Sequence, residues 1–388
     1  MVKELNNGLI NQLRDVITKT NIFIEDENEK EKYNFICAMM DRLETSVYYI
    51  NTNNKIPKND NGLILFMVHA CIIKDSINET LKILELEIER TYFFRKLCED
   101  EPFNILSEKY ISDDKIFEYF RSLIFAHPLK TSISIPNKIS KKEIQYSPYV
   151  LPNIPMNSLY RNGKNAIGAM VYSNERDMFP VFIDFDLLIT YLREKYLNVK
   201  RIIESFDNII EEKKNLWKKR KVNRDLDPID VLKDIISILC ERYEETYSIK
   251  ELIDYLNCEC SNPCNKIIMD KYKKKIENNI PNICDCIDNM DDQGLYDSIE
   301  TIFHEHVKGY PMVHYHVEKI FGYLTYEPNS GNIEFGKQMA DAFSKEFAKN
   351  WVVIDAFNMP FTEIKFLTKI ACKEQYELEK RSKWLWVI

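Results

Sequence analysis

Arg121 and His127 are the two residues whose types and spacing best suit chemistry on a phosphate group. They lie six positions apart in the run from Glu118 to Pro128. Imidazole has an ordinary pKa of about 6.5, so it can transfer a proton between two oxygens at cellular pH. A guanidinium group offers a fixed fork of N–H donors to the charge that builds on phosphoryl oxygens. The pair therefore has the residue types needed to cleave an RNA phosphodiester bond without a metal ion.

This run resembles the signature of the HEPN superfamily, in which an Arg is followed four to six residues later by a His; here five residues intervene. The resemblance covers at most residues 1–155. It implies a small helix bundle that carries the motif on a late helix. It also implies a metal-independent endoribonuclease that acts in phage defence or toxin–antitoxin growth arrest and leaves 2′,3′-cyclic phosphate and 5′-hydroxyl ends.

On this hypothesis His127 transfers protons, Arg121 stabilises the phosphate, and Ser122 is a minor polar helper where HEPN members often have Asn, Asp or His. Six residues on a regular α-helix correspond to about 9 Å of rise and roughly 120° of rotation. One copy of the pair would therefore straddle a phosphate poorly. The resemblance implies a composite site formed by two copies, so we expect a homodimer with an isologous interface.

A second reading of the same residues needs no catalysis. A cationic His127 is favourable at the C-terminus of a helix, and Arg121 can pair with Glu118 or Glu89 at the surface. The chain would then be a non-catalytic binding or regulatory protein that uses a HEPN-like bundle to recognise a nucleotide or a partner.

The elements that must position this motif are helices. Apolar residues at helical spacing predict four of them in the first third of the chain, and the third is apolar almost all round until Lys74. The fourth has Ser112 or Asp113 as its N-cap and must stop at His127, because Pro128 disfavours helical geometry in the residue before it. The four predicted helices cover residues 4–19, 33–50, 62 into the 80s, and 113–127.

The predicted fold is mainly α, with three parts. Residues 1–155 form the HEPN-like antiparallel bundle, residues 156–226 a β-hairpin plus a long basic helix, and residues 227–388 a helical C-terminal domain. Prolines make residues 128–165 irregular. The hairpin pairs Ala166–Tyr172 with Pro180–Phe185, and one helix runs from Leu187 to Lys221.

Basic residues near an aromatic ring predict where RNA binds. Trp217 can stack a base, while cations beside it follow the phosphate backbone. The alternative is a solvated helix end that is basic because the helix dipole favours cations there. The predicted RNA-binding residues are Trp217, Lys218, Lys219, Arg220 and Lys221, with Lys130 in a second patch that also includes Lys138, Lys141 and Lys142.

Two clusters suggest a metal, although the leading hypothesis requires no metal or other cofactor. Five cysteines are candidate zinc ligands: Cys258, Cys260, Cys264, Cys284 and Cys286. Their spacing differs from paired Cys–x2–Cys knuckles, so unligated thiols are the alternative. Four histidines form two His–x–His pairs, at 304 and 306 and at 314 and 316. On a helix each pair would point to nearly opposite faces, which favours structural or surface roles.

Composition limits the remaining classes. The 388 residues are 45% hydrophobic and 29% charged, which is typical of a globular protein. A net charge of −8 argues against indiscriminate nucleic-acid binding but not against a local basic groove. We expect a cytoplasmic protein, because the sequence lacks an apolar run of about 20 residues and a secretion signal. The expected partners are RNA, a second copy of the chain, and a cognate antitoxin or regulator, with no membrane.

Overall fold

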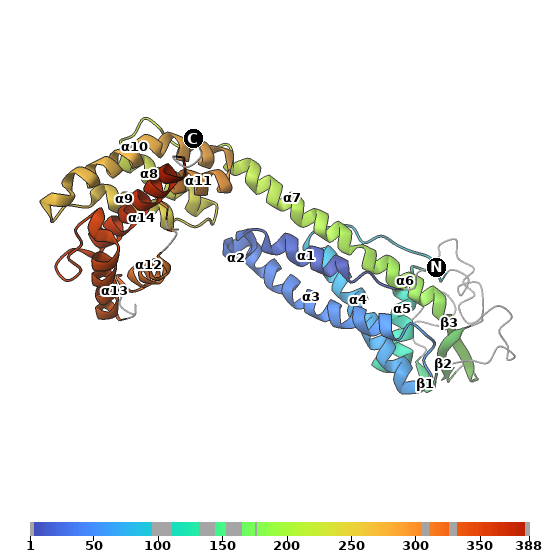
Figure 1. Ribbon diagram of the computed structural model, residues 1–388. Coiled ribbons are helices and arrows are strands. Elements are labelled where there is room, and N and C mark those ends of the chain that lie inside the picture. The colour runs from blue at the N-terminus through green and yellow to red at the C-terminus, as the bar shows by residue number, and fades with distance from the viewer. Residues whose placement is uncertain are drawn as a thin grey trace. The chain divides into compact units, whose positions relative to one another are not determined.

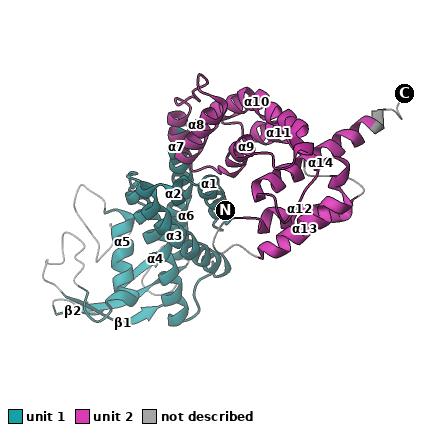
Figure 2. Ribbon diagram, turned by 90° about the vertical axis from the view of Figure 1, so that its left-hand side faces the viewer, with its two compact units in different colours: residues 1–211 teal, residues 212–388 magenta. Residues whose placement is uncertain are grey.

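The computed structural model describes residues 4–94, 111–131, 144–152, 165–174, 177–304, 307, 310–325 and 332–384. Within these ranges the chain is mainly helical with one small antiparallel sheet, which confirms the predicted fold class. It divides into two compact units, residues 1–211 and 212–388 (Figure 2). We refer to them as unit 1 and unit 2. The division lies between the boundaries that the sequence suggested near residues 155 and 226.

Unit 1 consists of helices with a sheet at one end (Figure 1). The division between the units falls inside its last helix. In chain order the elements are α1 (Gly8–Thr18), α2 (Ile22–Glu25), α3 (Glu27–Thr52), α4 (Asp60–Ile83), α5 (Asp113–Arg121), the π-helical turn η2 (Ser122–Ala126), β1 (Gln145–Leu151), β2 (Ala166–Ser173), β3 (Phe179–Asp184), α6 (Phe185–Leu197) and α7 (Val199–Trp217).

The helix α4 is central to the packing of unit 1. Asn59 caps its N-terminus by accepting a hydrogen bond from the Gly62 N–H at 2.8 Å. The helix packs against α3, α6 and η2. Phe66 and Ile73 are almost fully buried, and the Phe66 ring packs against Phe185 of α6 with centroids 5.0 Å apart. The predicted third helix is therefore confirmed as one that is buried on most sides.

The sheet has the order β1–β2–β3, and both strand pairs are antiparallel. The β2–β3 pair is the hairpin that the sequence predicted. The strand β1 was missed, because its segment was predicted to be irregular. Its inward positions are Gln145 and Ser147, so it lacks the apolar alternation of a half-buried strand. Pro148 lies where the β1–β2 register shifts, a bulge position that tolerates proline at a sheet edge.

The predicted helix from Leu187 to Lys221 is wrong in two respects. It breaks into α6 and α7 at Asn198, whose side-chain amide donates to the carbonyl oxygens of Glu194 and Lys195 at 3.2 Å. Such local hydrogen bonds compete with helix continuation. The second part ends at Trp217, so the basic residues 218–221 lie beyond the helix.

Among its described residues unit 2 contains helices and no strands. An aromatic cluster joins its helices: the Tyr255 ring stacks on Phe366 at 4.7 Å between centroids, and Phe303 packs edge-on against both. Its elements are α8 (Pro228–Glu241), α9 (Tyr247–Asn257), the 3-10 turn η3 (Pro263–Asn265), α10 (Lys266–Asn289), α11 (Asp292–Ile302), α12 (Pro311–Tyr323), α13 (Ile333–Glu346), the 3-10 turn η4 (Ala348–Asn350) and α14 (Phe361–Trp384).

In the described ranges, no helix has the length and apolar character required to cross a lipid bilayer.

Candidate active site

The candidate site lies on the pair formed by α4 and α5. Two side-chain contacts fix their alignment: Lys74 binds Glu118, and the Asn78 amide donates to Asp114 at 2.9 Å. Asn78 lies four residues after Lys74 on α4, whereas its partner Asp114 lies four residues before Glu118 on α5. The two helices are therefore antiparallel. These contacts link the face of α5 that carries Asp114 and Glu118 to α4.

Two acidic residues, Asp113 and Asp114, hold the start of α5 in place. Asp113 is fully buried, and its carboxylate accepts the backbone N–H groups of Phe93 and Phe94 at 2.8 Å. Asp114 accepts hydrogen bonds from Lys195 and Tyr191 of α6, both at 2.9 Å. Burial by itself would raise the pKa of Asp114, but these donors outweigh it and lower the pKa. The first turn of α5 is therefore fixed at several points.

Arg121 is the last residue of α5 and is about one-third exposed. Its Nη1 lies 3.5 Å from a carboxylate oxygen of Glu118 and 4.0 Å from one of Asp75. Both distances exceed those of a charge-assisted hydrogen bond, which are about 2.7–2.9 Å. Within the described residues its Nε is buried without a hydrogen-bond partner. The guanidinium group is thus close to carboxylates without being tightly bound to them.

The segment between Arg121 and His127 is a π-helical turn rather than the regular α-helix assumed from the sequence. The His127 N–H donates to the Ser122 carbonyl, five residues back, at 3.0 Å. The rise and rotation calculated for an α-helix therefore do not apply to this pair. Single π turns inside α-helices are frequent at functional sites.

His127 follows this turn and is exposed. Its carbonyl accepts a hydrogen bond from the Thr131 hydroxyl at 2.7 Å. In the described part of the chain, its imidazole has no hydrogen-bond partner. Leu129, two residues further along the chain, is 80% exposed, so an apolar side chain lies at the surface close to His127 in the sequence.

Ser122 is almost fully buried, and its hydroxyl donates to the Glu118 carbonyl at 3.0 Å. This bond lies within the helix and occupies the hydroxyl's single donor. The role of Ser122 as a polar helper remains a prediction.

The sheet is attached directly behind His127. The Ser147 N–H of β1 donates to the Pro128 carbonyl at 2.8 Å, and Thr131 and Gln145 exchange two backbone hydrogen bonds. Tyr146 of β1 and Tyr172 of β2 are paired across the two strands, and their rings stack with centroids 5.2 Å apart. Tyr172 is 39% exposed. Lys130, in the same connection, is also exposed.

The other predicted RNA-binding residues lie in unit 2, and three of them contact other residues of that unit. Arg220 binds Glu241 and lies 3.1 Å from Asp234. Lys221 donates to the Asp288 carbonyl at 2.7 Å. The Trp217 ring packs edge-on against Tyr243. Lys218 and Lys219 are exposed. Arg220 and Lys221 therefore connect segments within unit 2. Their role in RNA binding remains a prediction.

The five cysteines are not brought together as metal ligands. Among the described residues, no group of three or more His, Cys, Asp or Glu side chains is placed to hold a metal ion. Burial raises the pKa of Cys258 and of Cys284 to about 11, so both are protonated at cellular pH.

The histidine cluster is also dispersed where it is described. His304 lies 2.8 Å from a carboxylate oxygen of Glu300, and its ring packs on Tyr376. His316 is buried in α12, while His314 is exposed. His306 lies outside the described residues, as do Lys138, Lys141 and Lys142 of the second basic patch.

Sequence reasoning missed two residues beside Arg121. Lys74 is buried, and its ammonium group binds both Glu118 and Asp75. The available signal was a single lysine in a helix that is otherwise apolar all round, because a cation at such a position must find a carboxylate. Of the predicted neighbours, Glu118 is confirmed, whereas Glu89 lies near Arg201 instead, 3.6 Å away.

No family model matches the chain, and neither the curated proteins nor the solved structures contain a significantly similar protein.

Proposed function

We propose that unit 1 is a metal-independent endoribonuclease of the HEPN type that acts as a homodimer. The observation that carries this proposal is the state of the Arg121–His127 pair. Both side chains are accessible at the end of α5 and η2, and neither is closely bound to a carboxylate within the described residues. A guanidinium group in this state can accept a phosphate, and an exposed imidazole can exchange protons with solvent and substrate.

The reaction needs one proton removed and one supplied. An imidazole takes the proton of the RNA 2′-hydroxyl as its oxygen attacks phosphorus, and the bond from phosphorus to the 5′-oxygen breaks. A second imidazole, in its protonated form, gives a proton to the departing 5′-oxygen. Arg121 stabilises the charge on the remaining phosphoryl oxygens. The products are a 2′,3′-cyclic phosphate and a 5′-hydroxyl. Two copies of His127 across a two-fold axis would supply the base and the acid together.

An exposed apolar side chain close to His127 in the sequence supports the dimer. Leu129, two residues after His127, exposes a large apolar side chain, and we expect it to face a second copy. In an isologous interface each such side chain contacts the equivalent region of the partner. Burying them would place two motifs against one another and exclude water from the reacting groups.

A pair of stacked tyrosine rings supports single-stranded RNA as the substrate. The stacked Tyr146 and Tyr172 rings lie on the strands that are hydrogen-bonded to the segment after His127. Exposed aromatic rings stack unpaired bases with little regard for sequence. Lys130 would contact a phosphate nearby. In the setting that the HEPN resemblance implies, phage defence or growth arrest, unit 2 would receive the activating signal or bind an antitoxin.

The direct test is to incubate the full chain with mixed RNA in the presence of EDTA, which removes metal ions. We expect cleavage with 2′,3′-cyclic phosphate ends, and we expect Arg121→Ala and His127→Ala each to reduce the rate by at least about 100-fold. Both residues are at the surface, so thermal stability should change little. Arg193→Ala and His314→Ala are matched controls, since Arg193 is similarly exposed in unit 1 and His314 is exposed in unit 2.

Two results would contradict the proposal. If the wild type and both site variants cleave RNA at equal rates, the site is elsewhere. If the wild type forms a dimer that binds unpaired RNA but never cleaves it, the result supports a non-catalytic binding protein instead. Light scattering of the same sample gives the oligomeric state.

A further inference from the structure

Arg121 belongs to a network of four charged side chains on α4 and α5. Lys74 and Arg121 are its cations, and Asp75 and Glu118 are its anions. Each carboxylate faces both cations with a different oxygen. The network is therefore neutral, and its two cations compete for the same two anions.

Of the two cations, Lys74 lies closer to the two carboxylates. Its ammonium group binds one oxygen of Glu118 and lies 2.9 Å from one oxygen of Asp75. Its side chain is only 5% exposed, and the ammonium lies 5.7 Å from the centre of the Phe117 ring. A buried ammonium group loses its hydration and depends strongly on its partners. The charged form of Lys74 thus depends on the two carboxylates more strongly than that of Arg121 does.

Arg121 is left with the longer contacts to the remaining oxygens, at 3.5 and 4.0 Å. Unlike Lys74, it is partly hydrated, so it tolerates this arrangement. Without Lys74 the two carboxylates could close on the guanidinium group, which binds carboxylates well through its paired N–H donors. The network would also carry a net charge of −1, which disfavours a phosphate.

We propose that Lys74 is a positioning residue that keeps Glu118 and Asp75 away from Arg121, so that the guanidinium group is free to bind a phosphate. The phosphate in this statement rests on the proposed ribonuclease function. The availability of Arg121 rests on the geometry alone and can be measured without any reaction on RNA.

The measurement uses phenylglyoxal, which modifies accessible guanidinium groups, with peptide mass spectrometry to follow Arg121 in the full chain. Lys74→Met removes the charge and keeps most of the apolar stem. We expect Arg121 to be modified on the order of tenfold more slowly, the effect of one added charge-assisted hydrogen bond. Lys74→Met combined with Glu118→Gln restores neutrality, so it should recover most of the wild-type rate.

Lys195→Met is the matched control. Lys195 is as buried as Lys74, lies in the same unit, and binds the carboxylate of Asp114 at 2.8 Å, but it does not contact Arg121. This variant should lose stability and leave the modification of Arg121 unchanged. An equal slowing in both lysine variants would show a general structural effect and overturn the proposal.

Glu118→Gln provides a test that does not depend on removing a buried group, since Glu118 is 37% exposed. With Lys74 present, Glu118 restrains Arg121 only weakly, so the variant should change the modification rate by less than about twofold. An increase of tenfold or more would mean that Glu118 itself clamps Arg121, and the proposal would be wrong.

Activity separates this proposal from the ribonuclease function. If the modification rates change as expected and the wild type never cleaves RNA, Lys74 positions Arg121 but the proposed function fails. If the wild type cleaves RNA while Lys74→Met changes neither the modification of Arg121 nor kcat, the function stands and the role of Lys74 is refuted.

Discussion

Replacing Asp114 with asparagine should destabilise unit 1 by breaking the ion pair that anchors α5 to α6. Lys195 is 3% exposed and would keep a buried charge without its anion. Breaking such a pair from one side costs about 3–5 kcal/mol. The asparagine oxygen can still accept one of the hydrogen bonds that Lys195, Tyr191 and Asn78 donate to Asp114. We therefore expect a loss of about 3 kcal/mol, at the lower end of that range.

The pH dependence of the stability provides a second test of the contribution of Asp114. The pKa of Asp114 in the folded protein is below its ordinary value of 3.8. A lowered carboxyl pKa contributes stability that is complete above the ordinary pKa and is lost as the pH falls through the folded pKa. The difference between wild type and Asp114→Asn should thus be constant from pH 7 to pH 5. It should shrink only below about pH 3.8.

The assay is urea denaturation of the full chain, with hydrogen exchange of peptides from α4, α5 and α6 to report on unit 1. Glu44→Gln is the control, because Glu44 forms an ion pair with Arg14 at the surface of the same unit. It should cost at most about 1 kcal/mol. If both variants lose the same stability, the Asp114–Lys195 pair does not anchor α5. Asp114→Asn with Lys195→Met should recover part of the loss, since no unpaired charge remains.

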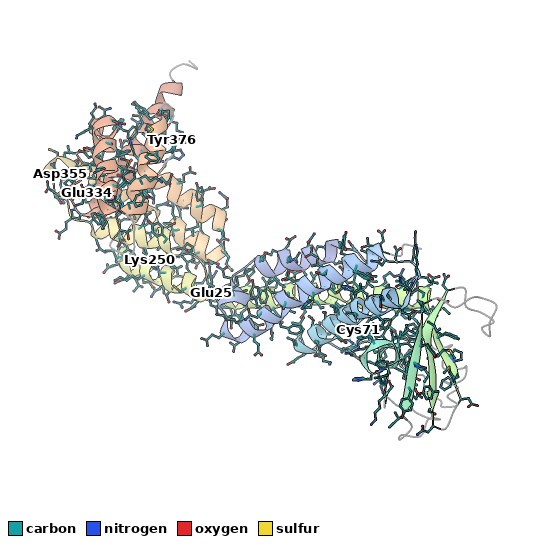
Figure 3. All side chains as sticks on the ribbon, turned by 90° about the horizontal axis from the view of Figure 1, so that it is seen from below. Glu25, Cys71, Lys250, Glu334, Asp355 and Tyr376 are labelled. Carbon is teal, nitrogen blue, oxygen red and sulfur yellow. The ribbon has the colours of Figure 1, made fainter. Side chains whose placement is uncertain are left out.

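Two further predictions concern packing in unit 1. Gly168→Ala should destabilise it by at least about 1–3 kcal/mol in urea denaturation, because a Cβ would lie 1.9 Å from the Val181 carbonyl oxygen of the paired strand. Gly322→Ala, in α12 where the Cβ meets open space, should cost nothing, and equal effects would refute the strand register. Burial raises the pKa of Cys71 on α4 (Figure 3) to about 12, so its thiol should resist iodoacetamide at about pH 8 until the protein unfolds. Exposed Cys264 should react at once, and equally fast labelling of Cys71 would contradict its burial.

Several helices of unit 1, α4 among them, could be predicted because their signals are local. Apolar residues at helical spacing gave α4, and Asn59 provided a polar cap next to it. The hairpin of β2 and β3 followed from two apolar segments around a polar turn. These patterns depend on residues a few positions apart, so one sequence suffices to recognise them.

The strand β1 shows where such patterns fail. Its inward side chains, Gln145 and Ser147, are polar, and the Gln145 Oε1 accepts a hydrogen bond from the Tyr119 hydroxyl of α5. Tyr119 is 26 residues away in the sequence, so no local pattern reveals the pairing. Burial of a polar residue depends on a partner that the fold supplies.

The sequence by itself determined the identity and spacing of Arg121 and His127, and the helix that carries Arg121. Tertiary structure decided the π turn between them and the presence of Lys74 and Asp75 beside Arg121. It also decided that Arg220 binds acidic groups and that the five cysteines do not gather. The reason is physical: backbone hydrogen bonds and side-chain spacing act along a few residues of chain, whereas the neighbours of a charge are set by packing between distant segments.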